Sequence, residues 1–214
     1  MKRTLRIFAL LLAAMLAIPG FAGCHGGESG VYDTPEPIVT PDPADPTEVP
    51  EFLRTPDPAL YQLTEDGIFE DEYLTMQMPS YMGFYTFSSP NSADYIGTMP
   101  SGNRLAFNYT WDTGGSFDEE CANFTFDSYQ EYLTTQMNSY FYLEEFAYVT
   151  IDGHTALRSI FRYEPPNDPD HLTHALQYLI NVNGWILSMG YSSLDEIPAE
   201  CEADIRAIKF KAGY

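Results

Sequence analysis

The chain is 214 residues long, which is room for one domain of ordinary size and additional segments. It carries 10 Lys and Arg against 31 Asp and Glu, a formal net charge of -21. This charge argues against nucleic-acid binding, because nucleic-acid partners require a basic face. Aromatic residues, 15% of the chain, can supply a core and exclude a wholly disordered protein. Three Cys are too few for a disulfide-dense scaffold or a four-thiolate zinc site.

Residues 1–23 have the composition of a signal peptide. Lys2, Arg3 and Arg6 give a basic start, an unbroken apolar run follows over Ile7–Ile18, and the segment contains no acid. That run is shorter than the roughly 20 residues that a helix needs to cross the hydrocarbon core of a bilayer. We therefore expect a signal peptide that takes no part in the folded domain.

The end of this segment, Phe21-Ala22-Gly23-Cys24, resembles the lipobox of bacterial lipoproteins. The resemblance implies that the Cys24 thiol takes a diacylglyceryl group and that cleavage makes Cys24 the N-terminus. The mature chain would keep 7 bases and 31 acids, a net charge of -24, so acyl chains rather than electrostatic attraction must hold it at the membrane. We expect a lipid-anchored protein on the outer, extracytoplasmic face of the cell membrane. The alternative is an ordinary secretory signal with an incidental Cys24.

Residues 24–64 are predicted to be a disordered stalk rich in Pro and acids. Over Thr34–Pro58 a Pro occurs every few residues, with Asp or Glu between. Pro favours the extended polyproline conformation, and repeated like charges extend the chain further. A Pro-rich segment can also be a docking ligand, but the acids favour a spacer between anchor and domain.

Residues 65–214 are predicted to be one domain, still acidic, with 23 acids and 6 bases. Two dipeptides that tolerate positive φ, Asp152-Gly153 and Asn183-Gly184, are flanked by β-branched and aromatic residues and predict two hairpins. A further strand is expected at Leu105–Trp111. The segment Tyr73–Met78 is expected to open the sheet.

Two helices are indicated by their period. The first carries an apolar stripe at helical spacing, with a capping-box pair, Ser128 and Glu131, near its start; the stripe is Phe126, Tyr129, Leu133, Met137 and Tyr140. The second carries Ile197, Cys201, Ile205 and Ile208, with Pro198 tolerated in the first turn. Strands, helix, four strands and helix in that order predict an α+β domain, an antiparallel β-sheet flanked by helices.

That arrangement resembles the PsbP-like family, which includes DcrB-like bacterial lipoproteins. The resemblance covers about residues 70–211 and is carried by four short segments: Tyr73–Pro79, Ser128–Tyr132, Ile151–Ala156 and Ile205–Phe210. It implies an α/β/α sandwich. These segments carry no chemistry, so the resemblance provides no catalytic residues.

Few residues suggest a metal or catalytic site. The four His are His25, His154, His171 and His174. His171 and His174 would lie on opposite sides of a strand, which disfavours a shared metal, and His154 is expected at the surface. The acidic turn Asn167–Asp170 lacks the pattern of a calcium loop and is expected to be solvated. No Ser has the setting of a nucleophile, and we expect no catalytic, cofactor or metal residue.

Three further groups leave alternatives open. Cys121 and Cys201 could form a disulfide in an exported protein, although nothing in the sequence places them together. Arg158 and Arg162 share a strand face and either balance nearby carboxylates, the favoured interpretation, or clamp an anion. Several Tyr could line a binding surface, but a structural role in a two-faced sheet is favoured: Tyr81, Tyr85, Tyr95, Tyr129, Tyr132, Tyr140 and Tyr142.

We expect a non-enzymatic binding or assembly module at the cell envelope, meeting a protein or small ligand. A hydrolase-type enzyme acting on envelope material is the alternative. A deep pocket with convergent, perturbed carboxylates would favour the enzyme.

Overall fold

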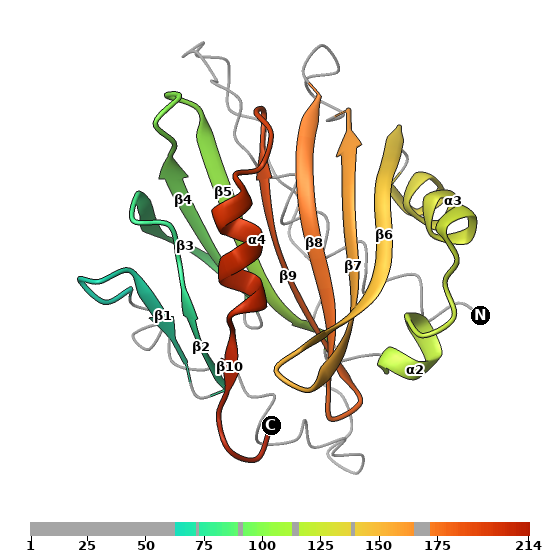
Figure 1. Cartoon of the computed structure of the whole chain (residues 1–214). Coiled ribbons are helices and arrows are strands. Elements are labelled where there is room, and N and C mark those ends of the chain that lie inside the picture. Colours follow the sequence, from blue (N-terminus) through green and yellow to red (C-terminus); the bar gives the residue numbers. More distant parts are fainter. Residues whose placement is uncertain (1–62, 72, 90–91, 113–115, 138–139, 165–171) are drawn as a thin grey trace, which may run out of the picture.

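The computed structural model describes residues 63–71, 73–89, 92–112, 116–137, 140–164 and 172–214. The predicted signal peptide, Cys24 and nearly all of the predicted stalk lie outside these residues. Within them the fold is α+β, with two antiparallel sheets and a few short helices (Figure 1).

A large antiparallel sheet forms the centre of the domain. Each strand pairs antiparallel with its neighbours. In spatial order the strands are β3 (Met82–Ser89), β4 (Ser92–Thr98), β5 (Arg104–Asp112), β9 (Trp185–Ser193), β8 (Thr173–Val182), β7 (His154–Tyr163) and β6 (Phe141–Ile151). The predicted strand at Leu105–Trp111 is therefore confirmed as β5.

Both predicted hairpins are present. Asp152-Gly153 joins β6 to β7, and Asn183-Gly184 joins β8 to β9. Asp152 and Asn183 have φ of 47° and 55°, and the Gly that follows each has φ of 92°. Positive φ at both central residues gives these two-residue turns the twist of the flanking strands.

The prediction that Tyr73–Met78 opens the main sheet was wrong. This segment contains β2 (Leu74–Gln77), which lies in a separate small sheet between β1 (Ile68–Glu70) and β10 (Lys209–Phe210). β2 buries Leu74 and Met76 in the core that it shares with the large sheet. The C-terminal β10 thus pairs with a strand from the start of the domain.

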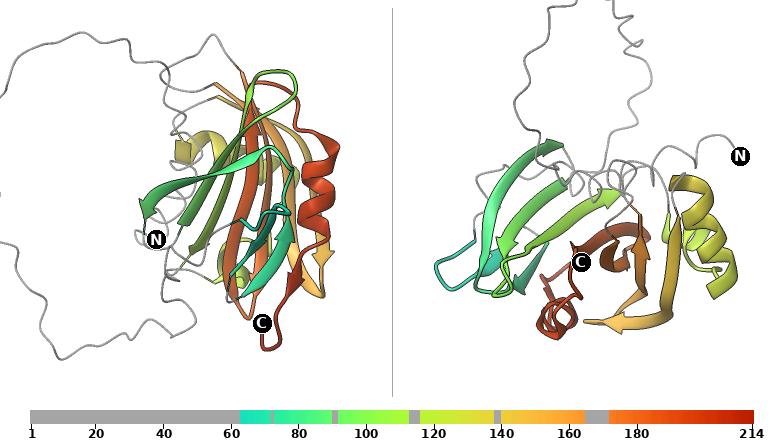
Figure 2. Two further views of the ribbon diagram at one scale, coloured as in Figure 1. Left: turned by 90° about the vertical axis from the view of Figure 1, so that its left-hand side faces the viewer. Right: turned by 90° about the horizontal axis from the view of Figure 1, so that it is seen from above.

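The central strands are buried on both faces. On β8, Leu176, Tyr178 and Ile180 pack in the core that includes the small sheet and α4 (Ala199–Arg206). Ala175 and Leu179 pack in a second core with α2 (Phe117–Glu120) and α3 (Phe126–Met137). Figure 2 shows α3 and α4 on opposite sides of the large sheet.

The predicted first helix is confirmed, but its cap and its end differ from the prediction. Thr125 and Ser128 form the capping pair: the Ser128 amide donates to Thr125 Oγ1 at 3.2 Å, and the Thr125 amide donates to Ser128 Oγ at 2.9 Å. The capping box therefore lies three residues before the predicted Ser128–Glu131 pair. The helix ends at Met137, and Tyr140, predicted on its stripe, lies outside it and is exposed.

The predicted C-terminal helix is confirmed as α4, but it is shorter than the predicted stripe, because Ile197 and Ile208 lie outside it. Cys201 and Ile205 are buried within the helix, and Pro198 is its N-cap residue rather than part of the first turn. A buried arginine ties α4 to the sheet, because Arg158 Nε and Nη2 of β7 donate to the two carboxylate oxygens of Glu202, both at 2.8 Å. Arg158 Nη1 also donates to Glu145 at 2.7 Å.

Replacing Glu202 by Ala should destabilise the fold by about 3 kcal/mol, because it removes both bonds of a fork and leaves Arg158 buried with Glu145 alone. Replacing Glu145 by Ala is the matched control. Its side chain is 59% exposed, so its loss should cost less than about 1 kcal/mol. Urea unfolding of the two variants and the wild type measures both values. Equal losses would contradict a special role for Glu202.

Candidate functional site

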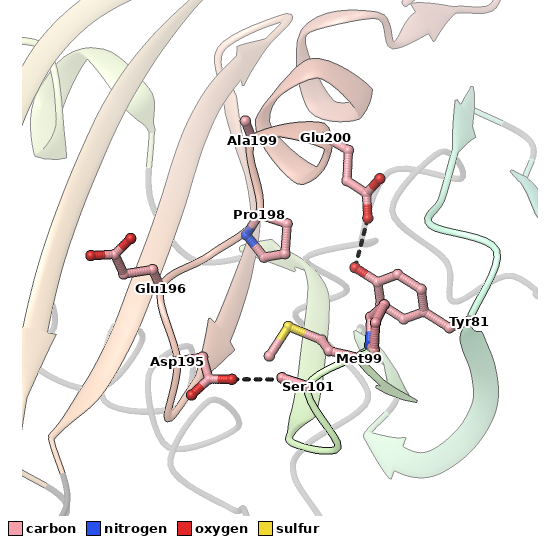
Figure 3. Close-up of a pocket in the computed structure, with 9 residues that line it drawn as sticks. Tyr81, Met99, Ser101, Asp195, Glu196, Pro198, Ala199 and Glu200 are labelled. Carbon is pink, nitrogen blue, oxygen red and sulfur yellow. Dashed lines mark hydrogen bonds between the residues drawn. The ribbon is translucent and has the colours of Figure 1, made fainter.

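A pocket of about 410 Å³ opens where three segments far apart in the sequence meet (Figure 3). One segment precedes β3, one is the β4–β5 turn, and one runs from the end of β9 into the first turn of α4. The lining residues are Tyr81, Met99, Pro100, Ser101, Asp195, Glu196, Pro198, Ala199 and Glu200.

Asp195 holds two walls of the pocket together. It accepts hydrogen bonds from Ser101 Oγ at 2.7 Å and from Asn103 Nδ2 at 2.8 Å, both in the β4–β5 turn. The bonds from Asn103 and Ser101 lower the pKa of the Asp195 carboxyl. The connection is fixed further because the Asp195 amide donates to Ser193 Oγ, which itself donates to the Arg104 carbonyl. The Asp195 carboxylate therefore connects the β4–β5 turn to the segment between β9 and α4.

Tyr81 joins the third wall to α4. Its hydroxyl donates to Glu200 Oε1 at 2.8 Å. Burial, followed by the bond to Glu200, raises the pKa of Tyr81, so the phenol stays protonated and acts as a donor. Gly97 of β4 lets the Tyr81 backbone approach closely, because a Cβ at position 97 would lie 2.6 Å from the Tyr81 carbonyl oxygen.

The pocket combines apolar walls with acidic side chains. Tyr81, Met99, Pro100 and Pro198 contribute apolar surface, Glu196 and Glu200 are exposed, and no Lys or Arg is among the lining residues. Of this set, the sequence indicated only Tyr81 as a binding residue, one of several Tyr that could line a binding surface, and it named Pro198 only for its place in a helix. No local pattern marks the others, because they come together only in the folded chain.

The two arginines predicted to balance carboxylates do so. Arg158 pairs with Glu202 and Glu145, as described, and Arg162 Nε lies 2.7 Å from Glu144 Oε1. Both lie on β7, away from the pocket lining. Their charges are therefore engaged by the protein's own acids, and the geometry does not favour the alternative of an anion clamp.

Cys121 and Cys201, whose pairing the sequence left open, do not form a disulfide, since both thiols are free. Cys121 packs in the core with α2 and α3, whereas Cys201 packs in the core on the other face of the sheet. Burial raises the pKa of both thiols, that of Cys201 to about 12. Both therefore remain protonated at neutral pH.

The histidines are not gathered at the pocket. His154 is half-buried rather than simply a surface residue: its Nδ1 lies 3.0 Å from the Asn181 carbonyl oxygen, and its ring packs against Phe210. His174 lies on β8 opposite Arg162. His25, His171 and the acidic turn 167–170 lie outside the described residues. Among the residues that are described, no three His, Cys, Asp or Glu are placed to hold a metal ion.

The tyrosines divide between structure and surface. Tyr95 and Tyr129 are buried, and the Tyr129 hydroxyl donates to Gln177 Oε1 at 3.0 Å across the interface between α3 and the sheet. Tyr132 is half-buried at the same interface, where it packs against Phe124. By contrast, Tyr140 and Tyr142 are exposed. The side chain of Tyr85 lies outside the described part of the structure.

One carboxyl outside the pocket is perturbed. Burial, then the charges of Asp112 and Glu119, raise the pKa of Glu120 to about 7. One Glu120 oxygen is buried and has no hydrogen-bond partner among the described residues. Glu120 is the last residue of α2, packed on the side of the sheet opposite α4. The fold therefore destabilises the ionised form of Glu120, and this residue is not part of the pocket.

Comparisons with known proteins place few constraints on this chain. No family model matches it, and no curated protein matches it. A protein of unknown function from Pseudomonas aeruginosa is 12% identical, with a TM-score of 0.38, and the match covers 57% of this chain and 88% of that one. A protein from Bacteroides thetaiotaomicron VPI-5482 is 7% identical, with a TM-score of 0.42, over 70% of this chain and 50% of that one. Both TM-scores are below 0.5, so the structural similarity is weak.

Among the described residues, no helix has the length and apolar character needed to cross a bilayer.

Glu120→Gln should stabilise the protein above pH 7 and leave it nearly unchanged below pH 4.5. The folded-state pKa is raised from 4.5 to about 7, so the folded state binds more protons in this window and loses stability as pH rises through it. The expected gain at pH 8 is about 1 kcal/mol, because solvent screens a half-exposed carboxylate.

Thermal unfolding at pH 4.5, 6 and 8 measures this effect. Asp118→Asn is the matched control, because Asp118 is exposed on the same helix and is not among the charges that raise the pKa of Glu120. Parallel pH profiles for Glu120→Gln and wild type would show that Glu120 titrates normally.

Proposed function

We propose that this protein is a lipid-anchored, extracytoplasmic binding or assembly module of the bacterial cell envelope. Cys24 carries the anchor, residues 24–64 are the spacer, and the domain from residue 65 onward meets a protein or small ligand. The proposal of an anchor rests on the basic start, the short apolar run and the small residues before Cys24.

We further propose that the domain is a PsbP-like α/β/α sandwich. Support comes from the antiparallel order of the large sheet and from the placement of α2 and α3 on one face and α4 on the other. In this proposal the small sheet of β1, β2 and β10 is an addition that completes the layer beside α4.

The pocket between the β4–β5 turn and α4 is the observation that carries the binding role. Its walls come from three segments and are held by side-chain hydrogen bonds from Ser101, Asn103 and Tyr81, so its shape is set before any ligand arrives. Preorganisation of this kind reduces the entropy cost of binding. Its volume is within the range of about 300–1,000 Å³ typical of small-molecule sites.

Cys24→Ala tests the anchor. The wild-type chain, produced in a bacterium fed an alkyne-bearing fatty acid, should become labelled and require detergent for release from membranes. The variant should lose the label, because it has no thiol to acylate at that position. Cys121→Ala is the control, since a buried thiol cannot be acylated in the folded domain, and it should be labelled as the wild type is. Label retained in Cys24→Ala would refute the anchor.

A photo-crosslinking residue at Ala199 tests the binding role in the full chain. Ala199 is exposed and lines the pocket, whereas Ala122, the control, is exposed after α2 on the other side of the sheet. Irradiation of intact cells should give a discrete adduct, found by mass spectrometry, only from position 199. Identical adducts from both positions, or none from position 199, would refute a binding role for the pocket.

A further inference from the structure

We propose that the pocket takes a small organic cation, an ammonium or guanidinium group carried on an apolar stem. This inference rests on the proposed binding role of the pocket and names the class of ligand. It is carried by the charge of the pocket, by the use already made of each carboxylate, and by the chemistry of the walls.

The negative charge of the pocket is not neutralised by its lining. Three carboxylates, Asp195, Glu196 and Glu200, line it, without a Lys or Arg. Of the six bases of residues 65–214, five form ion pairs with other acids: Arg158, Arg162, Arg206, Lys209 and Lys211. A concave site of one charge sign concentrates ligands of the opposite sign.

The three carboxylates are used to different extents. Asp195 accepts bonds on both oxygens, from Ser101 and Asn103. Glu200 accepts from Tyr81 on one oxygen, Oε1. Glu196 has no hydrogen bond or ion pair with any residue that the structure describes. Glu196 and the second oxygen of Glu200 are therefore available to a donor from outside.

The walls favour an organic cation over a metal ion. Calcium requires six or more oxygen ligands, and the oxygens of Asp195 are already committed to the β4–β5 turn. An organic cation can instead place an apolar stem against Met99 and Pro198, with its charge near the ring of Tyr81. A cation over an aromatic face gains about 0.5–1 kcal/mol at exposed sites.

A buried hydroxyl beside the pocket is a second, independent observation. Tyr191 is fully buried, and its hydroxyl has no hydrogen-bond partner among the described residues. Burial is the main cause of the raised pKa of this phenol, and the neighbouring Cys201, Asp204 and Glu200 add to it. A buried polar group without a partner costs free energy, so a bound ammonium or guanidinium that reached this hydroxyl would gain a hydrogen bond.

Titration of the full chain, purified in detergent, tests the proposal with three probes: n-pentylamine, agmatine and the neutral 1-pentanol. Binding is followed by isothermal calorimetry and by amide NMR shifts of the residues lining the pocket. At least one amine should bind saturably and shift the amide signals of residues 81 and 195–200. Its affinity should fall as salt is added and should exceed that of 1-pentanol by about tenfold or more.

Glu196→Gln/Glu200→Gln should weaken amine binding by about tenfold, because it removes both available charges while the amide oxygen at position 200 can still accept from Tyr81. The control is Glu131→Gln with Glu119→Gln, which removes two exposed acids from α3 and α2 on the far side of the sheet. Equal weakening in the control would show non-specific attraction to an acidic protein and refute the site, as would an undiminished affinity in the pocket variant.

The outcomes separate this inference from the proposed function. If 1-pentanol binds in the pocket as well as the amines do, the binding role stands and the cationic ligand is refuted. If none of the probes binds, the cationic ligand is again refuted, and the crosslink from position 199 decides independently whether the pocket has another ligand.

Discussion

The fork between Arg158 and Glu202 is the interaction on which the rest of this structure depends. A buried guanidinium is tolerated only when its donors are matched, and Glu202 matches two of them. The helix that carries Glu202 is otherwise held by a short apolar stripe and by the hydrogen bond from Tyr81 to Glu200. The fork sets where α4 lies on the sheet. Since the first turn of α4 carries Ala199 and Glu200, the same fork positions one wall of the pocket.

The two-layer covering of the sheet follows from its central strands. β8 and β9 present apolar side chains to both sides, so each side needs a cover: α4 with the small sheet on one, and α2 with α3 on the other. The outer edge strand β6 is protected by α3, because Gln130 accepts from the Leu143 amide and donates to the Phe141 carbonyl, both at 2.6 Å. A polar side chain there takes the place of a neighbouring strand, which limits pairing with another chain.

Several elements could be predicted because their signals are local. Asp152-Gly153 and Asn183-Gly184 tolerate the φ that hairpins need, and the stripe at Cys201, Ile205 and Ile208 has helical spacing. β3 and β4 were not predicted, because Gly and Ser interrupt the alternation of apolar and polar residues in these strands. The need for glycine at position 97 is explained only by the close approach of the Tyr81 backbone. The cap of α3 was predicted three residues too late. Ser128 is three residues from both Thr125 and Glu131, and only the hydrogen bonds of the folded chain show that it pairs with Thr125.

The sequence by itself determined the α+β class, the two hairpins and the presence of the two longer helices, because each depends on spacing within a short segment. Overall charge balance favoured the pairing of Arg158 and Arg162 with acids but did not decide it. Only the tertiary structure decided the place of β2, the separation of Cys121 from Cys201, and the pocket itself. The pocket unites residues near positions 81, 100 and 197. Its charge arises from contacts between segments about a hundred residues apart, and no local pattern encodes such contacts.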